Sequence, residues 1–372
     1  MEVYLDNAAS TKLDPQVQKT MLLDTYANPS SSHSLGKQSK EFIENSRKII
    51  AKSINADTEE IYFTSGGTES NNLAIKGILS ATNKTHIITS VIEHPSVLNV
   101  CKSLKGYTIT YLGVDERGYI NIEELRSSIN DNTALVTIMH ANNELGVIQD
   151  IKTISEICKK KNIPFHTDAV QSFKKVPIDV KRIQASSLSI SAHKIHGPKG
   201  IGALYIKKGT KINSLMQGGH QEHSLRPGTE NVTAILGFAA ATQMPIDVKS
   251  IAKLRDYFIS ALKEIPNSKI NSRDLCNIIN VSFKGITSSN LINHLNQNNI
   301  YASTGSACSS NQIEPSYVLK AINAEDSIRF SLSKFTTKEE IDYTIKHLKA
   351  MVLSLRDLND LNKSGNTRRN KK

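Results

Sequence analysis

Short apolar segments of strand length recur along the first half of the chain, and each ends in small or polar residues before a helical segment follows. These segments lie at residues 61–64, 86–90, 133–139, 163–168 and 188–191. Strands that alternate with helices predict a mostly parallel sheet with helices on both of its faces. Such sheets bind ligands beyond the carboxyl ends of their strands. We therefore expect an α/β protein whose site is assembled from the residues that directly follow its strands.

The regular alternation stops after about residue 243, which indicates a second domain. We expect a large domain over residues 15–246 and a smaller α+β domain over residues 247–358, with residues 1–14 packing against the small domain. Residues 359–372 are polar and basic, and segments of that composition bury too little apolar surface to fold. They are expected to form a disordered tail.

The composition argues against several classes of protein. No apolar run approaches the ~18 residues that a membrane span needs, and the acidic, strand-like start of the chain is unlike a signal peptide. None of the four cysteines forms a C-x-x-C pair, so no disulfide framework or zinc site is predicted and a reducing, cytoplasmic setting is expected. The net charge is +11, but no nucleic-acid-binding signature accompanies it, so direct nucleic-acid binding is not predicted.

A lysine stands directly after the strand at residues 188–191. The strand leads into Ala192, His193 and Lys194, and the glycine-proline turn at residues 197–200 follows at once. An amine that is shielded from water loses its charge more easily, and Lys194 is therefore suited to forming an imine with an aldehyde. A solvated loop lysine is the commoner explanation for a lone lysine, but the other strand ends argue against it here.

Residues at those other strand ends supply what pyridoxal phosphate requires. Asp168 can pair with a protonated pyridine nitrogen, and His94 can stack on the ring. Gly67 and Thr68 begin a helix, where free amides and the helix dipole favour a phosphate, although a glycine pair before a helix is by itself more often only a tight turn. Together with Lys194, these residues predict pyridoxal phosphate as the cofactor.

The sequence resembles the cysteine desulfurases of the NifS/IscS group, within the class V aminotransferase family, from Tyr4 to about Leu355. The motifs that carry the resemblance are TSGGTESN at 64–71, NNE at 142–144, HTDAVQ at 166–171, SAHK at 191–194, RPGT at 226–229 and STGSAC at 303–308.

This resemblance implies a fold type I enzyme that uses pyridoxal 5'-phosphate to remove sulfur from L-cysteine, giving L-alanine and a persulfide on Cys308. It implies that Lys194 holds the cofactor and moves protons, that Gln171 binds the ring hydroxyl, and that Asn143 lies beside the ring and the substrate. Arg329 is expected to bind the substrate carboxylate through two hydrogen bonds.

The resemblance also assigns the surroundings of the phosphate and the partner subunit. Ser191 and His193 are expected near the phosphate. Thr229 matches a threonine that reaches the phosphate held by the partner subunit, so a homodimer is implied. His94 is in addition the candidate that accepts the proton of Cys308, because the thiolate is the reactive form.

Cys308 differs from the other three cysteines in its setting. It lies in a run of small polar residues, where a thiol gains no packing, whereas Cys101, Cys158 and Cys276 are expected to be inert. The long loop at residues 305–315 resembles that of family members whose cysteine carries sulfur to an acceptor, either an iron–sulfur scaffold or a tRNA-thiolation enzyme. No metal site is expected, apart from transient iron–sulfur ligation by Cys308. The acceptor stays open, because the longer C-terminal segment that helps to dock the scaffold is lacking.

Three alternatives are weighed against this interpretation. An aminotransferase of class V needs no loop thiol, so Cys308 argues against it. A selenocysteine lyase is left open by the sequence. An inactive module that binds RNA or a scaffold would have no reason to combine Lys194, Asp168 and Arg329 with Cys308.

Overall fold

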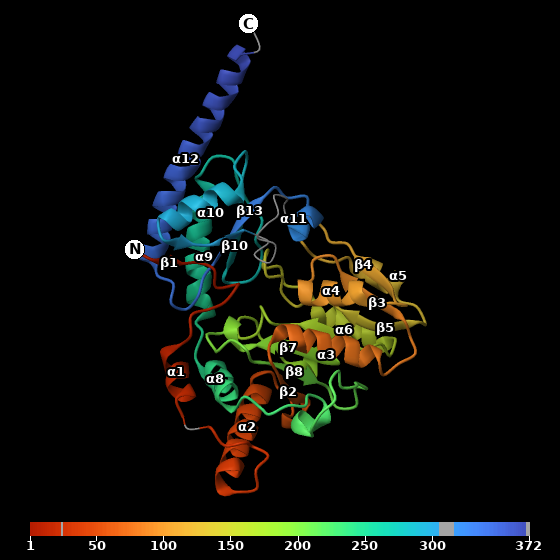
Figure 1. Cartoon of the computed structure of the whole chain (residues 1–372). Coiled ribbons are helices and arrows are strands. Elements are labelled where there is room, and N and C mark those ends of the chain that lie inside the picture. Colours follow the sequence, from red (N-terminus) through yellow and green to blue (C-terminus); the bar gives the residue numbers. More distant parts are fainter. Residues whose placement is uncertain (24, 305–315, 370–372) are drawn as a thin grey trace. The chain divides into compact units, whose positions relative to one another are not determined.

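The structure is a computed structural model that describes residues 1–23, 25–304 and 316–369, with only the backbone described for 357–369. The chain divides into two compact units, whose elements are labelled in Figure 1. The large unit comprises Ser10–Asn142 and Ile148–Ile246, and the small unit comprises Met1–Ala9, Asn143–Val147 and Asp247–Lys372. Two short segments therefore differ from the expected division: residues 10–14 belong to the large unit, and residues 143–147 belong to the small unit.

A seven-stranded sheet forms the centre of the large unit. Its strands, in the order in which they pair, are β2 (Ile61–Thr64), β8 (Gly202–Ile206), β7 (Ser187–Ser191), β6 (Phe165–Asp168), β5 (Thr133–Thr137), β3 (His86–Ser90) and β4 (Thr108–Leu112). Only β8 runs antiparallel to its neighbours, and β2, which pairs with β8, therefore runs in the same direction as the rest. The expected mostly parallel sheet is confirmed. The carboxyl ends of the six strands other than β8 share one edge.

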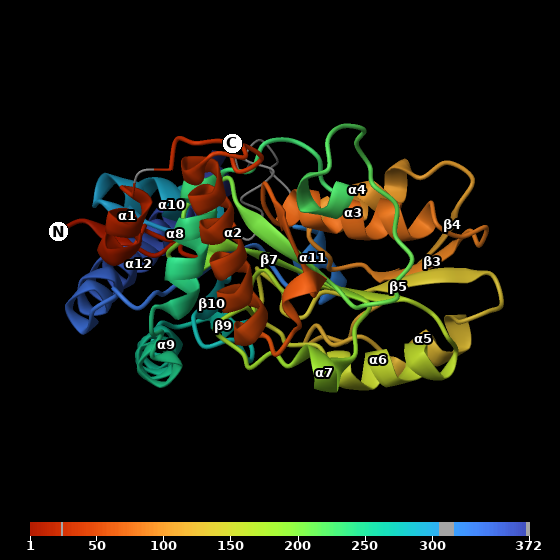
Figure 2. The same ribbon diagram turned by 90° about the horizontal axis from the view of Figure 1, so that it is seen from below.

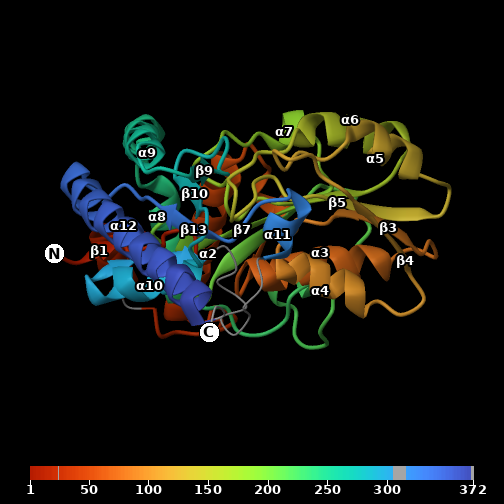
Figure 3. The same ribbon diagram turned by 90° about the horizontal axis from the view of Figure 1, so that it is seen from above.

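Helices cover both faces of this sheet. Figures 2 and 3 show α3 (Gly67–Leu79) and α4 (Pro95–Ser103) on one face and α5 (Ile122–Ser128), α6 (Ile151–Lys160) and α7 (Val180–Ile183) on the other. Strands that are covered from both sides have both of their faces buried, so polar residues such as His166 and Ser189 lie inside together with apolar ones. Every residue of β5, β6 and β7 is buried.

Three further helices of the large unit form a group in which two of them pack on the third, α8 (Val232–Gln243). These two are α1 (Pro15–Met21) and α2 (Ser34–Ser53). The start of α1 follows from two residues: Asp14 accepts a hydrogen bond from the amide of Gln16 (2.8 Å), and Pro15 occupies the first helical position, where its missing N–H costs nothing.

The small unit has an antiparallel sheet of four strands in the order β12 (Ser303–Thr304), β13 (Ser327–Ser331), β10 (Ile278–Phe283) and β9 (Ser268–Ile270). The N-terminal strand β1 (Val3–Tyr4) pairs in parallel with β11 (Ile300–Tyr301). The helices of this unit are α9 (Val248–Lys263), α10 (Ser288–Gln297), α11 (Tyr317–Ala321) and α12 (Lys338–Arg369). No helix in the described part of the chain is long and apolar enough to cross a membrane.

The end of the chain differs from the expected disordered tail. Helix α12 continues through residue 359 as far as Arg369. The segment contains no proline, and extending a helix that has already formed costs little compared with starting one.

Candidate active site

The carboxyl edge of the large sheet brings Lys194, Asp168 and His94 onto neighbouring segments. Lys194 ends the 3-10 turn Ala192–Lys194, which begins directly after β7. This turn is held by hydrogen bonds to its carbonyl oxygens: the amide (3.0 Å) and the hydroxyl (2.9 Å) of Thr11 donate to that of His193, and the ammonium of Lys175 donates to that of Lys194 (3.2 Å). The backbone that carries Lys194 is therefore held in place.

Asp168 is the last residue of β6, and both of its carboxylate oxygens accept hydrogen bonds. The amide of Val170 donates to Oδ1 (2.9 Å), and the side-chain amide of Asn71 donates to Oδ2 (2.7 Å). The side chain is buried, and a buried carboxylate needs such donors or a cation to balance its charge. The arrangement suits a partner that carries a positive charge.

His94 follows β3 and caps the start of α4. Its Nδ1 accepts a hydrogen bond from the amide of Ser96 (3.2 Å) and lies 2.8 Å from the Ser96 hydroxyl. Burial lowers the pKa of His94 below its ordinary value; Asp168 opposes this shift and Lys194 adds to it. His94 is therefore a neutral imidazole near pH 7, and it lies close enough to both residues to respond to their charges.

The start of α3 supplies a place for an anion. The first intrahelical hydrogen bond runs from the amide of Ser70 to the carbonyl oxygen of Gly66 (3.0 Å), so the amides of Gly67 and Thr68 precede it and point out of the helix. Ser191 Oγ is buried without a hydrogen-bond partner among the described residues, and it lies 4.0 Å from where a Cβ on Gly66 would stand. Outward amides and an unused hydroxyl form a cradle for a phosphate.

Gly67 is required by the close approach of α3 to the loop that follows Asp168. A Cβ at this position would lie 2.7 Å from Cγ2 of Val170, a separation that atoms do not tolerate. The absence of a side chain therefore lets the helix start lie directly beside β6.

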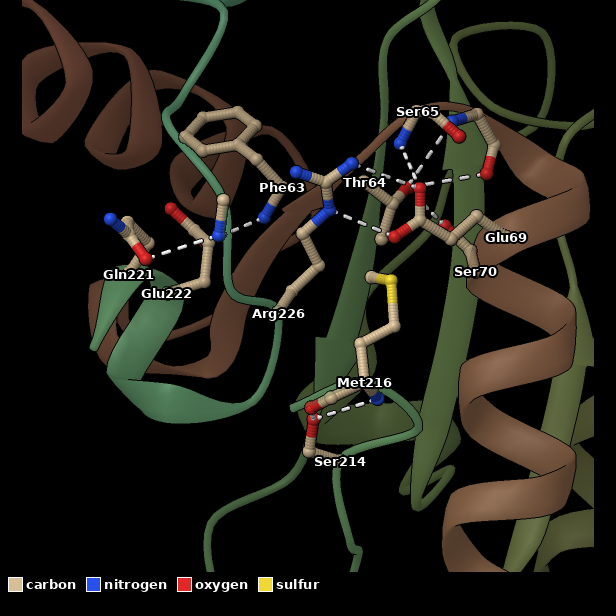
Figure 4. Close-up of polar contacts among 12 residues, drawn as sticks. Phe63, Thr64, Ser65, Glu69, Ser70, Ser214, Met216, Gln221, Glu222 and Arg226 are labelled. Atoms are coloured by element: carbon tan, nitrogen blue, oxygen red, sulfur yellow. Dashed lines mark hydrogen bonds and ion pairs between the residues drawn. The ribbon is translucent and has the colours of Figure 1, made fainter. Parts of the chain in front are cut away.

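The loop that carries Thr229 is tied to the same helix start, as Figure 4 shows. Arg226 Nε donates to Glu69 Oε1 (2.9 Å), and Glu69 Oε2 accepts from the amide of Ser65 (2.7 Å). Burial of Glu69 opposes ionisation, but the hydrogen bonds from Arg226 and Ser65 outweigh it and lower the pKa of this carboxyl. Thr229 itself is exposed.

Two more of the expected cofactor residues lie in the same region. Gln171 is buried and lies three residues after Asp168. Its backbone carbonyl oxygen accepts a hydrogen bond from the ammonium of Lys175 (3.0 Å). The His193 ring lies 3.3 Å from the hydroxyl of Ser10. Burial, followed by the charges of neighbouring lysines, of which Lys194 is the first, lowers the pKa of His193 to about 4.

Arg329 and Asn143 belong to the small unit. Arg329 is only 2% exposed; Nη2 binds Asp6 Oδ1 (2.8 Å) and Nη1 binds the carbonyl oxygen of Asn143 (3.0 Å). Its Nε is buried without a partner among the described residues. A guanidinium with an unused donor has capacity for a further anionic group.

Cys308 lies outside the described residues, so its place is not part of this geometry. Within the described residues, no group of three or more histidine, cysteine, aspartate or glutamate side chains is arranged to hold a metal ion.

Sequence reasoning missed three polar residues of this site: Asn71, Ser96 and Lys175. Asn71 lies within the TSGGTESN motif and Ser96 lies two residues after His94, so their positions near recognised residues were the available signal. Which of their side chains point at Asp168 and His94 depends on how α3 and α4 are rotated against the sheet.

Glu93, which precedes His94, is fully buried and carries a testable consequence. Its Oε1 accepts from the hydroxyl of Ser90 (2.6 Å) and from the amide of Met139 (2.9 Å). Burial raises the pKa of Glu93 to about 8, against these hydrogen bonds, and the charge of Asp168 adds to the rise. The side chain is therefore protonated at neutral pH in the folded protein.

We expect Glu93→Gln to remove one source of pH-dependent stability. Folded Glu93 keeps its proton up to about pH 8, whereas the unfolded chain releases it near pH 4.5, so the wild-type free energy of unfolding falls as pH rises between these values. The free energy of unfolding of wild type should therefore fall more steeply with pH than that of Glu93→Gln, by up to about 1.4 kcal/mol per pH unit. Urea unfolding of both proteins at pH 5.5, 6.5 and 7.5 measures these free energies. If they change with pH by the same amount in both proteins, Glu93 is not protonated in the folded state.

Comparison with known proteins gives matches over nearly the whole chain. Residues 3–344 match the family model described as Aminotransferase class-V. The cysteine desulfurase IscS of Dictyoglomus turgidum is 46% identical over 378 residues, which cover 96% of this chain and 96% of that protein.

Two solved structures resemble the chain over nearly its whole length. A NifS-like protein superposes with a TM-score of 0.89 at 38% identity, covering 95% of this chain and 100% of that one. SspA in complex with cysteine superposes with a TM-score of 0.81 at 37% identity, covering 91% of this chain and 100% of that one.

Proposed function

The chain belongs to the class-V aminotransferase family, and from this premise we infer that it is a cysteine desulfurase, which releases L-alanine from L-cysteine and passes the sulfur on. The observation that carries the inference is the grouping of Lys194, Asp168 and His94 at one sheet edge, in a chain that is similar to a cysteine desulfurase over 96% of its length. The similarity to SspA in complex with cysteine supports the substrate.

We propose pyridoxal phosphate as the cofactor, because the large unit offers a group for each of its parts. The outward amides of α3 and Ser191 Oγ would hold the phosphate, Asp168 would pair with the pyridine nitrogen, and His94 would lie against the ring. When bound, the cofactor supplies a ring that takes up negative charge from the substrate.

The chain's own residues then have defined tasks. Lys194 would hold the cofactor covalently, and its side-chain amine would move the proton of the substrate α-carbon. Asp168 would keep the pyridine nitrogen protonated through its negative charge. Gln171 is proposed to hydrogen-bond the ring hydroxyl, and His193 is proposed to lie near the phosphate. Asn143 is proposed to lie beside the ring and the substrate.

Cys308 is proposed as the sulfur carrier. Its thiolate attacks the substrate sulfur: a sulfur–sulfur bond forms, the carbon–sulfur bond of the substrate breaks, and the electron pair of that bond stays on carbon, where a proton completes alanine. The persulfide is then passed to an acceptor, an iron–sulfur scaffold or a tRNA-thiolation enzyme. Exposed Thr229 is proposed to reach the phosphate of a second subunit in a homodimer. The thiols of Cys101, Cys158 and Cys276 are buried, which suits the reducing cytoplasm.

The direct test is to purify the protein, load it with pyridoxal phosphate and add L-cysteine with a thiol reductant. Equal amounts of alanine and sulfide should appear over many turnovers. L-selenocysteine is added in a parallel reaction: a much higher kcat/KM for it would favour a selenocysteine lyase. Transfer of the amino group to a keto acid without sulfide release would indicate an aminotransferase and contradict the proposal.

Arg329 is proposed to bind the substrate carboxylate, and we expect Arg329→Lys to raise the KM for L-cysteine by about 10- to 100-fold. Lysine keeps the charge opposite Asp6 but loses the fork of donors that binds a carboxylate twice, a loss on the order of 1.4–3 kcal/mol. Steady-state kinetics measure KM, and the cofactor absorbance should be unchanged. The control is Arg255→Lys on α9, which should leave KM as it is. An unchanged KM in Arg329→Lys would place the carboxylate elsewhere.

A further inference from the structure

The side-chain amide of Asn71 contacts Asp168 directly and is linked to His94 through Ser96. Asn71 is completely buried on the first turns of α3. Its Nδ2 donates to Asp168 Oδ2 (2.7 Å) and to Ser96 Oγ (2.8 Å), and its Oδ1 lies 3.1 Å from His166 Nε2. One amide therefore joins three segments: β6, the start of α4 and α3 itself.

The directions of these hydrogen bonds follow from the chemistry of the groups. A carboxylate only accepts, so the amide nitrogen of Asn71 must face Asp168, and its two hydrogens are used by Asp168 and Ser96. Its oxygen must then accept from His166, which places the His166 proton on Nε2. His166 Nδ1 lies 2.9 Å from the hydroxyl of Ser187 and accepts from it. His166 is wholly buried, and burial lowers its pKa to about 3, so the ring stays neutral.

The tautomer of His94 is set by the same hydrogen bonds. Because Ser96 Oγ accepts from Asn71, its own hydrogen is free to point at His94 Nδ1, 2.8 Å away. The amide of Ser96 donates to that same nitrogen (3.2 Å). Nδ1 of His94 is therefore an acceptor, and the single proton of the neutral ring is on Nε2.

We propose that Asn71 is a positioning residue, which fixes the carboxylate of Asp168 toward the cofactor nitrogen and, through Ser96, keeps the proton of His94 on Nε2. The inference rests on the proposed function, since Asp168 and His94 are there assigned to the cofactor. It changes the expected role of His94: the unprotonated nitrogen is already bound to Ser96, so His94 would have to release Ser96 before it could take the proton of Cys308. In this arrangement His94 offers a hydrogen bond from Nε2 instead.

The test compares two substitutions of Asn71. Only one of them, Asn71→Asp, introduces a side chain that can donate a hydrogen bond to Asp168, and it does so only when it is protonated. Asn71→Ala removes the donor, and the dissociation constant for pyridoxal phosphate should rise about 10-fold at both pH 6 and pH 8.5. Asn71→Asp puts a second carboxyl beside Asp168, and two adjacent carboxylates raise the pKa of one of them. At pH 8.5 this variant should bind at least 10-fold more weakly than wild type. Near pH 6 the introduced carboxyl is protonated and donates to Asp168, so binding should return to within about 3-fold.

Binding is measured by equilibrium dialysis of the full-length protein, and each variant is compared with wild type at the same pH. Glu93 and His94, whose pKa values respond to the charge of Asp168, and the neutral His166 are present in every protein, so each comparison is made at a single pH. Asn213→Asp is the matched control, because Asn213 is an exposed amide that donates to the carbonyl oxygen of Ser80 (2.9 Å); its binding should equal wild type. If Asn71→Asp and Asn71→Ala bind alike at both pH values, the positioning role is overturned.

A second measurement tests the proton on His94. In protein labelled with ¹⁵N-histidine, two-bond ¹H–¹⁵N correlations show which ring nitrogen carries the proton, with or without the cofactor. The expected result is Nε2, and a proton on Nδ1 would reverse the chain of hydrogen bonds and overturn the proposal. A wild-type protein that binds no pyridoxal phosphate would instead contradict the proposed function, so the two failures are distinguishable.

Discussion

Lys194→Ala should fold, and cysteine turnover should fall by at least about 10³- to 10⁴-fold, because both the covalent attachment of the cofactor and a proton-transferring amine are lost. The substitution removes a half-buried side chain from a turn whose backbone is held by Thr11 and Lys175, so the surrounding structure has no reason to change. Alanine formation measures the loss of turnover. Borohydride reduction followed by peptide mass spectrometry measures the attachment.

Lys175 is a second lysine to which the cofactor could attach, and the same experiment distinguishes it from Lys194. Lys175 lies beside Lys194, but its ammonium donates to two carbonyl oxygens, those of Gln171 (3.0 Å) and Lys194 (3.2 Å), and such donation favours the charged, unreactive form. In wild type, the reduced cofactor should be found on Lys194 alone. Lys199→Ala, an exposed lysine of the same loop, is the control and should keep full activity. Cofactor trapped on Lys175, or turnover that survives in Lys194→Ala, would move the attachment site.

Much of the large sheet could be predicted because its strands are buried on both faces. The apolar runs at residues 61–64 and 86–90 coincide with β2 and β3 at both ends. Helix α8 could not be recognised in the same way. It is apolar around its whole circumference, with residues such as Ile235, Phe238 and Ala241 buried, so the alternation that marks a surface helix is missing. The antiparallel direction of β8 was also hidden, because pairing depends on distant segments.

The division of the chain shows the same limit for long-range contacts. Residues 143–147 belong to the small unit because Leu145 and Gly146 accept hydrogen bonds from backbone amides of Arg273 (2.9 Å) and Leu275 (2.8 Å), residues far away in the sequence. Gly146 has φ = 70°, which glycine adopts without strain. Nothing in the local sequence announces the pairing with residues 273–275.

The candidate site was predictable where a residue ends a strand or lies in the turn after it, as Asp168 and Lys194 do. The edge of a parallel sheet brings such residues together whatever the details of packing. Asn71 and Ser96 were missed because each acts from a helix, and the direction of a helical side chain depends on how the helix is rotated. Lys175 lies outside the motifs considered, and nothing in the sequence distinguishes it from the other lysines.

Cys308→Ser should abolish sulfur transfer while it leaves the cofactor and the substrate bound. The serine hydroxyl is nearly the same size as the thiol but far less acidic, and it does not hold a transferable sulfur atom. Lys194, Asp168 and Arg329 are unchanged in this variant, so it should bind pyridoxal phosphate and change its absorbance when L-cysteine is added. Neither alanine in catalytic amounts nor a persulfide should appear. The measurement is incubation with ³⁵S-labelled L-cysteine, followed by release of protein-bound label with a thiol reductant.

The remaining cysteines provide three matched controls within the same chain. Cys101, Cys158 and Cys276 are all buried, and burial raises the pKa of both Cys101 and Cys158 to about 12, which leaves almost no thiolate at neutral pH. Replacing any of them by serine should therefore leave the transfer of labelled sulfur intact. Label that persists in Cys308→Ser, or that disappears only when one of these three is replaced, would identify a different sulfur carrier. It would also mean that a buried thiol becomes reactive during turnover, although burial raises its pKa and so disfavours the thiolate.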